Sequence, residues 1–118
     1  MTPFCSIPEA ISELKKGRML IVVDSPDREN QGDIIFPAEL ATSEKVAFLQ
    51  NNCRGMVCVG LAKSQAVRLN LPLMVPHQNN TEITGVQFTV TVDAHNVTSF
   101  GISAADRAKT IQILASKT

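Results

Sequence analysis

The stretch MLIVVDSPDRENQGDIIF, residues 19 to 36, places an acidic loop between two apolar segments. Residues 19–23 are aliphatic without polar alternation, which predicts a strand covered on both faces. Residues 34–36 predict a second strand, which Pro37 either places at a sheet edge or ends, because proline has no amide to donate to a neighbouring strand. The ten residues between these segments hold four carboxylates and one arginine. The stretch therefore predicts a strand, a charged loop and a second strand.

The rest of the chain carries further helix and strand patterns. Helix caps are expected at Ser6, at Thr42 or Ser43, and at Ser103, and the first helix should end at Gly17. A short helix is predicted over about residues 64–69, and further strands over residues 56–61 and 87–92, with a long loop over residues 71–84. There is no repeat or linker, so residues 1–118 are expected to form one domain. We predict the α+β class, with a mixed β-sheet and helices packed in layers.

Composition restricts the partners of the protein. The 118 residues are 44% apolar, which is enough for a core, and eleven basic residues cancel eleven acidic ones. No net field would attract nucleic acid or an anionic membrane. The longest apolar run is too short to cross a bilayer, and no signal pattern opens the chain, so we expect a soluble, cytoplasmic protein. Three cysteines without CxxC spacing indicate reduced thiols.

The acidic loop, residues 24–33, has two interpretations. Asp, Ser, Pro, Asn and Gly are the usual turn-forming residues, so the loop could be a solvated turn. Alternatively, carboxylates clustered between two strands can bind a hard cation such as Mg²⁺, together with a phosphorylated substrate. Arg28 offers a planar donor fork for a phosphate or carboxylate, and crowded carboxylates raise one another's pKa. The residues alone leave both interpretations open.

The motifs of the chain resemble one enzyme family throughout. The run VVDSPDRENQGD, residues 22–33, resembles the D-R-E-N-E-G-D signature of the 3,4-dihydroxy-2-butanone 4-phosphate synthases. The resemblance continues, in the order of the family, through GMVCV at 55–59, LPLMV at 71–75, FTVTVD at 88–93 and GISAADRA at 101–108. It covers almost the whole chain.

This resemblance implies a lyase of riboflavin biosynthesis. The reaction would convert D-ribulose 5-phosphate into formate and 3,4-dihydroxy-2-butanone 4-phosphate, with Mg²⁺ or Mn²⁺ as the cofactor. Carried over by position, Glu29 would be the metal ligand, and Arg28, Glu29 and Asp33 would bind the substrate. Glu29, Asp33 and Cys58 would form the catalytic set, with Cys58 near the sugar. The resemblance also implies a homodimer whose sites draw on both subunits.

The chain departs from the family pattern at two places. Gln31 stands where the family has a second glutamate, and a neutral amide cannot relay a proton. The family continues beyond the helix that Ser103 opens into P-G-H and G-H-T-E signatures, which supply the metal-binding histidine. His77 and His95 match neither signature. We therefore expect the N-terminal portion, truncated at the C-terminus, of a stand-alone synthase or of a bifunctional chain with GTP cyclohydrolase II. The alternative is a catalytically incomplete relative that acts as a phosphosugar-binding or dimerisation module.

Some residues also have a plainly structural interpretation. Cys58 lies in an apolar segment and is expected as a small buried hydrophobe if it has no chemical role. Ser103 and Asp106 are expected to cap a helix, although a helix N-terminus can also bind an anion. Phe88 is expected in the core.

Overall fold

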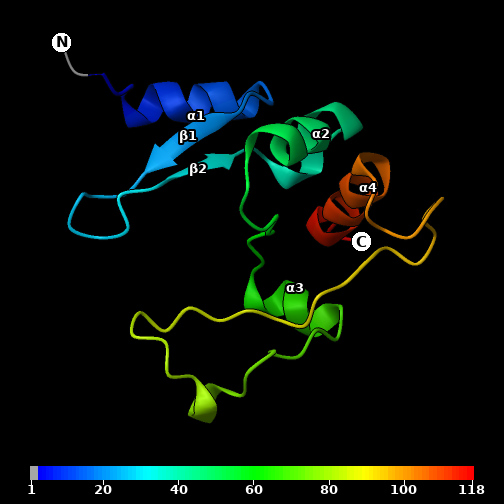
Figure 1. Cartoon of the computed structure of the whole chain (residues 1–118). Helices are drawn as coiled ribbons and strands as arrows, with labels where there is room; N and C mark the ends of the chain where they lie inside the picture. The colour runs from blue at the N-terminus through cyan, green and yellow to red at the C-terminus, as the bar shows by residue number, and fades with distance from the viewer. Residues whose placement is uncertain (1–2) are drawn as a thin grey trace.

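The computed structural model describes residues 3–118 and contains four α-helices and two strands in that part of the chain (Figure 1). Two 3-10 turns, Ala38–Leu40 and His77–Asn79, connect them. In chain order the elements are α1 (Ile7–Lys15), β1 (Leu20–Val23), β2 (Gly32–Ile35), α2 (Ser43–Asn52), α3 (Lys63–Arg68) and α4 (Ala104–Ala115). The expected α+β class is confirmed.

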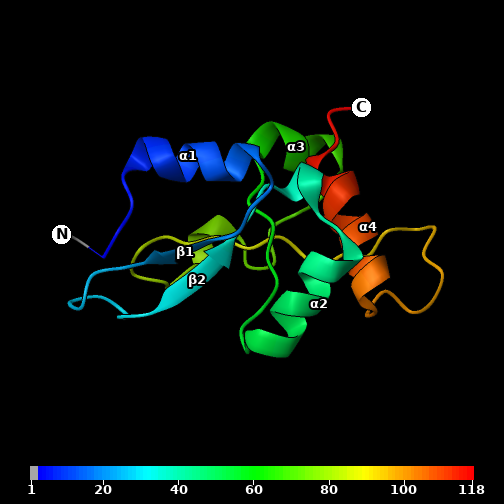
Figure 2. The same ribbon diagram turned by 90° about the horizontal axis from the view of Figure 1, so that it is seen from above.

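The core lies where α2 packs against α4, and the two helices are neighbours in both views (Figures 1 and 2). Thr42 accepts a hydrogen bond from the Lys45 amide and begins α2, as its sequence pattern predicts. Gln112 of α4 donates a hydrogen bond to the Ala41 carbonyl oxygen over 2.6 Å. This bond links α4 to the segment just before α2. The buried apolar cluster consists of Ala41, Val46, Ala108 and Ile111.

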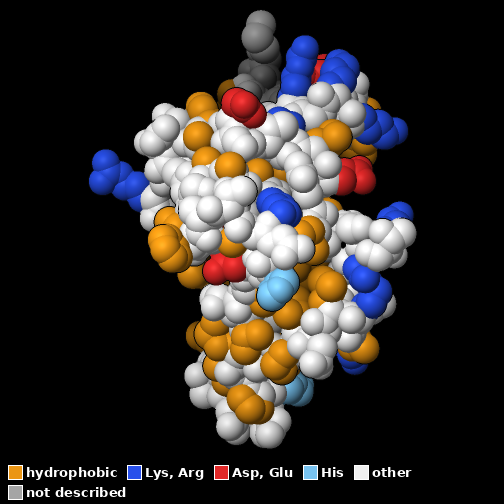
Figure 3. Space-filling model, turned by 90° about the vertical axis from the view of Figure 1, so that its right-hand side faces the viewer, with side chains coloured by type: hydrophobic (Ala, Val, Ile, Leu, Met, Phe, Trp, Pro, Cys, Tyr) orange, Lys and Arg blue, Asp and Glu red, His pale blue; other side chains and the backbone are white. Residues whose placement is uncertain are grey.

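Much apolar surface lies outside this core. Figure 3 shows hydrophobic side chains gathered over the lower part of one face, at the height of α3 and of the long connection that follows it. Phe88 is 48% exposed, so its expected place in the core is wrong. Cys58 is exposed as well, which contradicts the expectation of a buried thiol. None of the helices in residues 3–118 has the length and apolar character needed to cross a membrane.

Strands β1 and β2 form an antiparallel ribbon. Leu20 pairs with Ile35 and Val23 pairs with Gly32, so the predicted strand, loop and strand are confirmed, with β2 beginning two residues earlier than expected. The expectation that β1 is covered on both faces is wrong. Ile21 is 74% exposed, and Val22, which points to the opposite face, is also exposed.

The other two predicted strands are not formed within residues 3–118. Residues 56–61 have no strand partner, and residues 87–92 make only one isolated bridge, between Leu73 and Thr89. Two backbone bonds support that bridge, from Met74 to the Phe88 oxygen and from Val90 to the Pro72 oxygen. The expected mixed sheet is therefore only a two-stranded antiparallel ribbon here, because these segments lack neighbouring strands.

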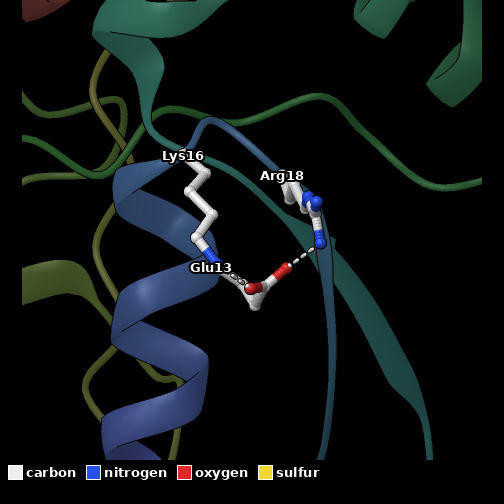
Figure 4. Close-up of polar contacts among 3 residues, drawn as sticks. All are labelled: Glu13, Lys16 and Arg18. Atoms are coloured by element: carbon white, nitrogen blue, oxygen red, sulfur yellow. Dashed lines mark hydrogen bonds and ion pairs between the residues drawn. The ribbon is translucent and has the colours of Figure 1, made fainter.

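Helix α1 follows its sequence signals closely. The Ser6 amide donates to Glu9 Oε2 over 2.8 Å, and the Glu9 amide donates to Ser6 Oγ over 3.4 Å, which completes the predicted capping box. Beyond the helix, Gly17 adopts a positive φ of 77°. Glu13 holds the turn by ion pairs with Lys16 at 2.7 Å and Arg18 at 2.6 Å (Figure 4). These local contacts fix the path into β1.

Candidate active site

The acidic loop is closed by Asp24, at its first position. The Glu29 amide donates to Asp24 Oδ2 over 3.0 Å, and the Gln31 amide donates to Asp24 Oδ1 over 2.8 Å. The hydrogen bond from the Gln31 amide is the main reason that the pKa of Asp24 lies below its usual range. Asn30 adopts a positive φ of 53°, which asparagine tolerates better than most residues. Asp24 is therefore occupied in shaping the loop.

The remaining charged groups of the loop face outward. Arg28 and Glu29 are exposed, and within residues 3–118 neither side chain makes an ion pair or a side-chain hydrogen bond. Asp33 lies on β2 opposite Val22 and is exposed too. The ribbon thus carries all three at or beside its loop end, which extends away from the helices (Figures 1 and 2). Their side chains are available to a ligand.

Cys58 comes from a different part of the chain. It lies on the segment between α2 and α3, which has no strand partner in the described residues. The place of Cys58 beside the sugar stays a prediction. The site residues are therefore carried by two separate segments, the ribbon and the connection after α2.

The acidic loop offers carboxylate oxygens suited to a hard cation, although not a complete ligand set. Residues 3–118 contain no group of three or more His, Cys, Asp or Glu side chains that could hold a metal ion. Mg²⁺ commonly binds through one or two protein carboxylates and retains several waters or substrate oxygens. The donor chemistry of Glu29 and Asp33 fits that mode, with the other ligands coming from outside this part of the chain.

The two histidines lie away from the loop. His77 Nδ1 is 2.6 Å from Gln87 Nε2, in the long connection after α3. His95, with Asp93 and Lys109, lines a largely apolar cavity of about 370 Å³ beside α4. None of the predicted site residues lines this cavity.

A second polar cluster surrounds Asp106, at the start of α4. Asp106 is only 2% exposed, and its carboxylate accepts hydrogen bonds from the amides of Thr98, Ser99 and Gly101 at 3.1 to 3.2 Å. The hydroxyls of Thr98 and Ser99 donate to it as well. The Ser99 hydroxyl is the largest cause of a pKa far below the usual range of an aspartate. A buried, fully bonded carboxylate of this kind organises the loop before the helix.

Sequence reasoning identified only part of this cluster. Ser103 accepts a hydrogen bond from the Asp106 amide, so the predicted cap of α4 is confirmed. The larger role of Asp106, which holds residues 98–101, was missed. The available signal was Thr98 and Ser99, followed two residues later by Gly101. Short polar side chains and glycine are typical of a tight loop, and Gly101 has a φ of 84°.

Comparisons with known proteins agree with the motifs. The family model of 3,4-dihydroxy-2-butanone 4-phosphate synthase matches residues 8–118. The synthase of Campylobacter jejuni is 50% identical over 112 residues, which are 95% of this chain and 32% of that protein. The synthase of Agrobacterium fabrum is 47% identical over 111 residues, which are 94% of this chain and 51% of that protein.

Solved structures give the same result for the fold. A crystal structure of 3,4-dihydroxy-2-butanone 4-phosphate synthase in complex with two magnesium ions matches with a TM-score of 0.89 at 39% identity, covering 97% of this chain and 52% of that one. The Candida albicans synthase matches with a TM-score of 0.84 at 44% identity, over 99% of this chain and 56% of that one. The chain thus spans about half the length of these synthases or less. It belongs to the 3,4-dihydroxy-2-butanone 4-phosphate synthase family.

Proposed function

We propose that this chain supplies part of the active site of a lyase that converts D-ribulose 5-phosphate into 3,4-dihydroxy-2-butanone 4-phosphate and formate. The observation that carries the proposal is the signature loop, which Asp24 closes, and in which the side chains of Arg28 and Glu29 are exposed and make no ion pair or side-chain hydrogen bond within residues 3–118. The family match over residues 8–118 supports the same reaction. A separate, non-catalytic binding or dimerisation module is not favoured, because these relatives are named as synthases.

Each loop residue has a role that its chemistry supports. Glu29 would contribute a carboxylate oxygen to a divalent cation, Mg²⁺ or Mn²⁺, which when bound polarises the carbonyl and hydroxyl oxygens of the sugar. Arg28 would orient the substrate through its guanidinium fork, and an Asp33 carboxylate oxygen would accept a hydroxyl proton. Cys58 would line the sugar. Gln31 can accept a hydrogen bond but cannot carry a proton between these groups.

A complete site needs more than these residues supply. The remaining metal ligands and the phosphate contacts would come from the half of the family's chain that these residues do not match. The homodimer and the cytoplasmic location implied earlier remain predictions. Sedimentation velocity on the purified protein would measure directly whether it is a homodimer.

The test is formate release from D-ribulose 5-phosphate, with and without Mg²⁺. The protein to assay is this chain followed by the half of the Agrobacterium fabrum synthase that it does not match. We expect Glu29→Ala to lower kcat at least about 100-fold, because a metal ligand and transition-state charge stabilisation are lost together. Glu44→Gln, a charge removal at an exposed residue of α2 outside the signature, is the control and should stay within about twofold. Equal rates for Glu29→Ala and the parent protein would remove Glu29 from the mechanism.

A further inference from the structure

Gln31 lies opposite Asp24 at the loop end of the ribbon. The Asp24 amide donates to the Gln31 oxygen over 3.2 Å, and the Gln31 amide donates to Asp24 Oδ1 over 2.8 Å, so the pairing of β1 with β2 continues through these two residues. Residues paired across an antiparallel ribbon extend their side chains from the same face, and so do residues two apart along one strand. Gln31 therefore shares one face of the ribbon with Asp24 and with Asp33 of β2.

The side chain of Gln31 is open to a ligand. It is exposed, and within residues 3–118 it makes no hydrogen bond. Only the backbone of Gln31 takes part in closing the loop, through its two bonds with Asp24. The geometry of the loop therefore does not depend on the side-chain amide at position 31, whose chemistry matters for what binds on this face.

A neutral residue at position 31 limits the negative charge of this face. Residues 24–33 hold four carboxylates against one arginine. Positions two apart on a strand are separated by about 7 Å, so a carboxylate at position 31 would lie about that far from a cation bound by Glu29 or Asp33. In bulk water, one added negative charge at this distance raises the affinity for a divalent cation about sevenfold. Gln31 forgoes this attraction because its amide is neutral.

We propose that Gln31 sets the cation affinity of the candidate site. Because position 31 is neutral, the site binds a divalent cation weakly in the absence of sugar, and oxygens of the substrate supply the remaining attraction. The same neutrality spares an anionic sugar phosphate one repelling charge. The proposal rests on the proposed function, since it takes Glu29 as a metal ligand, but it concerns binding and not turnover.

The test measures Mn²⁺ binding without sugar, by electron paramagnetic resonance of the free ion. The protein is the same joined chain as in the formate assay. At about 10 mM ionic strength, we expect Gln31→Glu to lower the dissociation constant for Mn²⁺ at least about fivefold. At about 1 M salt the gain should fall below about twofold, because the Debye length is then about 3 Å. A gain that persists at high salt would contradict the proposal, since the new carboxylate would then bind the ion directly.

Two control variants separate the charge from other effects. Gln31→Ala removes the side-chain amide without adding a charge, and its Mn²⁺ dissociation constant should stay within about twofold of the parent value. Gln78→Glu adds the same charge in the 3-10 turn His77–Asn79, which lies apart from the loop end of the ribbon (Figure 1), and it should also stay within about twofold. Gln78 is exposed, and its side chain makes no hydrogen bond within residues 3–118. A gain in either control equal to that of Gln31→Glu would overturn the proposal.

Amide hydrogen exchange shows whether the loop stays closed in Gln31→Glu. Exchange at Glu29 and Gln31 should be as slow as in the parent protein, and faster exchange would contradict a role of Gln31 through its charge alone.

The remaining outcomes separate this proposal from the lyase. With a closed loop, an unchanged dissociation constant in Gln31→Glu would overturn the role of Gln31 and leave the lyase in place. No Mn²⁺ binding by either protein, or full binding by Glu29→Ala, would overturn both. A gain in affinity without formate release would keep the role of Gln31 and contradict the lyase.

Discussion

At the scale of single residues, the acidic side chains divide into two kinds. Asp24 and Asp106 accept hydrogen bonds from groups close to them in the sequence, and these bonds lower the pKa of each, chiefly the Gln31 amide for Asp24 and the Ser99 hydroxyl for Asp106. In the described part of the chain, the carboxylates of Asp33 and Glu29 accept no such bonds and remain open to ligands. The division arises because an aspartate at the start of a tight loop or helix reaches nearby amides with its short side chain. Charge alone does not identify a binding carboxylate here.

The buried carboxylate of Asp106 provides the first stability prediction. Asp106→Asn replaces an acceptor oxygen by an NH2 group, which would face the amide donors of Ser99 and Gly101. We expect the melting temperature to fall by about 10 °C. Differential scanning fluorimetry measures it, with Asp27→Asn as an exposed control that should change little. A melting temperature like that of the parent chain would show that these bonds contribute nothing net.

At the scale of elements, the ribbon and its loop form one unit. The Asp24 amide also donates to the Gln31 oxygen over 3.2 Å, so the backbone pairing of β1 and β2 continues one step into the loop. Two carboxylate bonds then hold the tip. This closure holds the backbone of Arg28 and Glu29 at a defined place at the end of the hairpin. The geometry of the candidate site therefore depends on a residue that takes no part in the proposed chemistry.

Removing that closure should loosen the loop and leave the rest of the chain folded. In Asp24→Ala the amides of Glu29 and Gln31 lose their acceptor. We expect their hydrogen exchange to accelerate at least about tenfold, with the amides of α2 and α4 unchanged. Asp24→Asn retains one acceptor oxygen and should give an intermediate rate. Unchanged exchange at both amides would mean that other contacts hold the loop.

At the scale of the whole molecule, the core is small and lies to one side. Packing of α2 on α4 buries four apolar residues, while α1 and the ribbon contribute no buried side chain among the described residues. A two-stranded ribbon by itself is marginally stable in water. The stability of this chain alone should therefore come from the α2 and α4 region, with the remainder depending on what covers it.

Acid should destabilise the chain. Five carboxyl groups have a pKa below their usual range because they accept hydrogen bonds, and Asp106 is the buried one among them; the five are Glu9, Glu13, Asp24, Glu82 and Asp106. A lowered folded-state pKa adds stability above the unfolded pKa of about 4, and this stability is lost as the pH falls further. We expect a melting temperature that is steady from about pH 8 to pH 5.5 and falls below about pH 4.5.

The Asp106→Asn variant is the control for that titration. It should lose less stability than the parent chain between about pH 5 and pH 3, because the group with the largest lowering is gone. Melting curves at matched ionic strength provide the comparison. A melting temperature that rises on acidification, or parallel losses in both proteins, would contradict the assignment.

Helix starts could be predicted well, and strand partners could not. The caps at Ser6, Thr42 and Ser103 are confirmed because a cap involves only residues within one turn of the helix. Residues 56–61 have the correct period for a strand, yet no strand forms without a neighbour to bond with. The roles of Arg28, Glu29, Asp33 and Cys58 stay predictions, because they require a ligand and residues beyond this part of the chain.

The sequence by itself determined the family, the α+β class, the helix boundaries and the position of the acidic loop, because motifs and caps depend on residues close together in the chain. Only the tertiary structure decided that Asp24 and Asp106 are structural, that β1 is uncovered, and that residues 55–61 have no backbone partner within residues 3–118. These properties depend on which groups meet across the fold. Burial and backbone pairing arise from contacts between segments that are far apart in the sequence, so a local sequence pattern does not predict them.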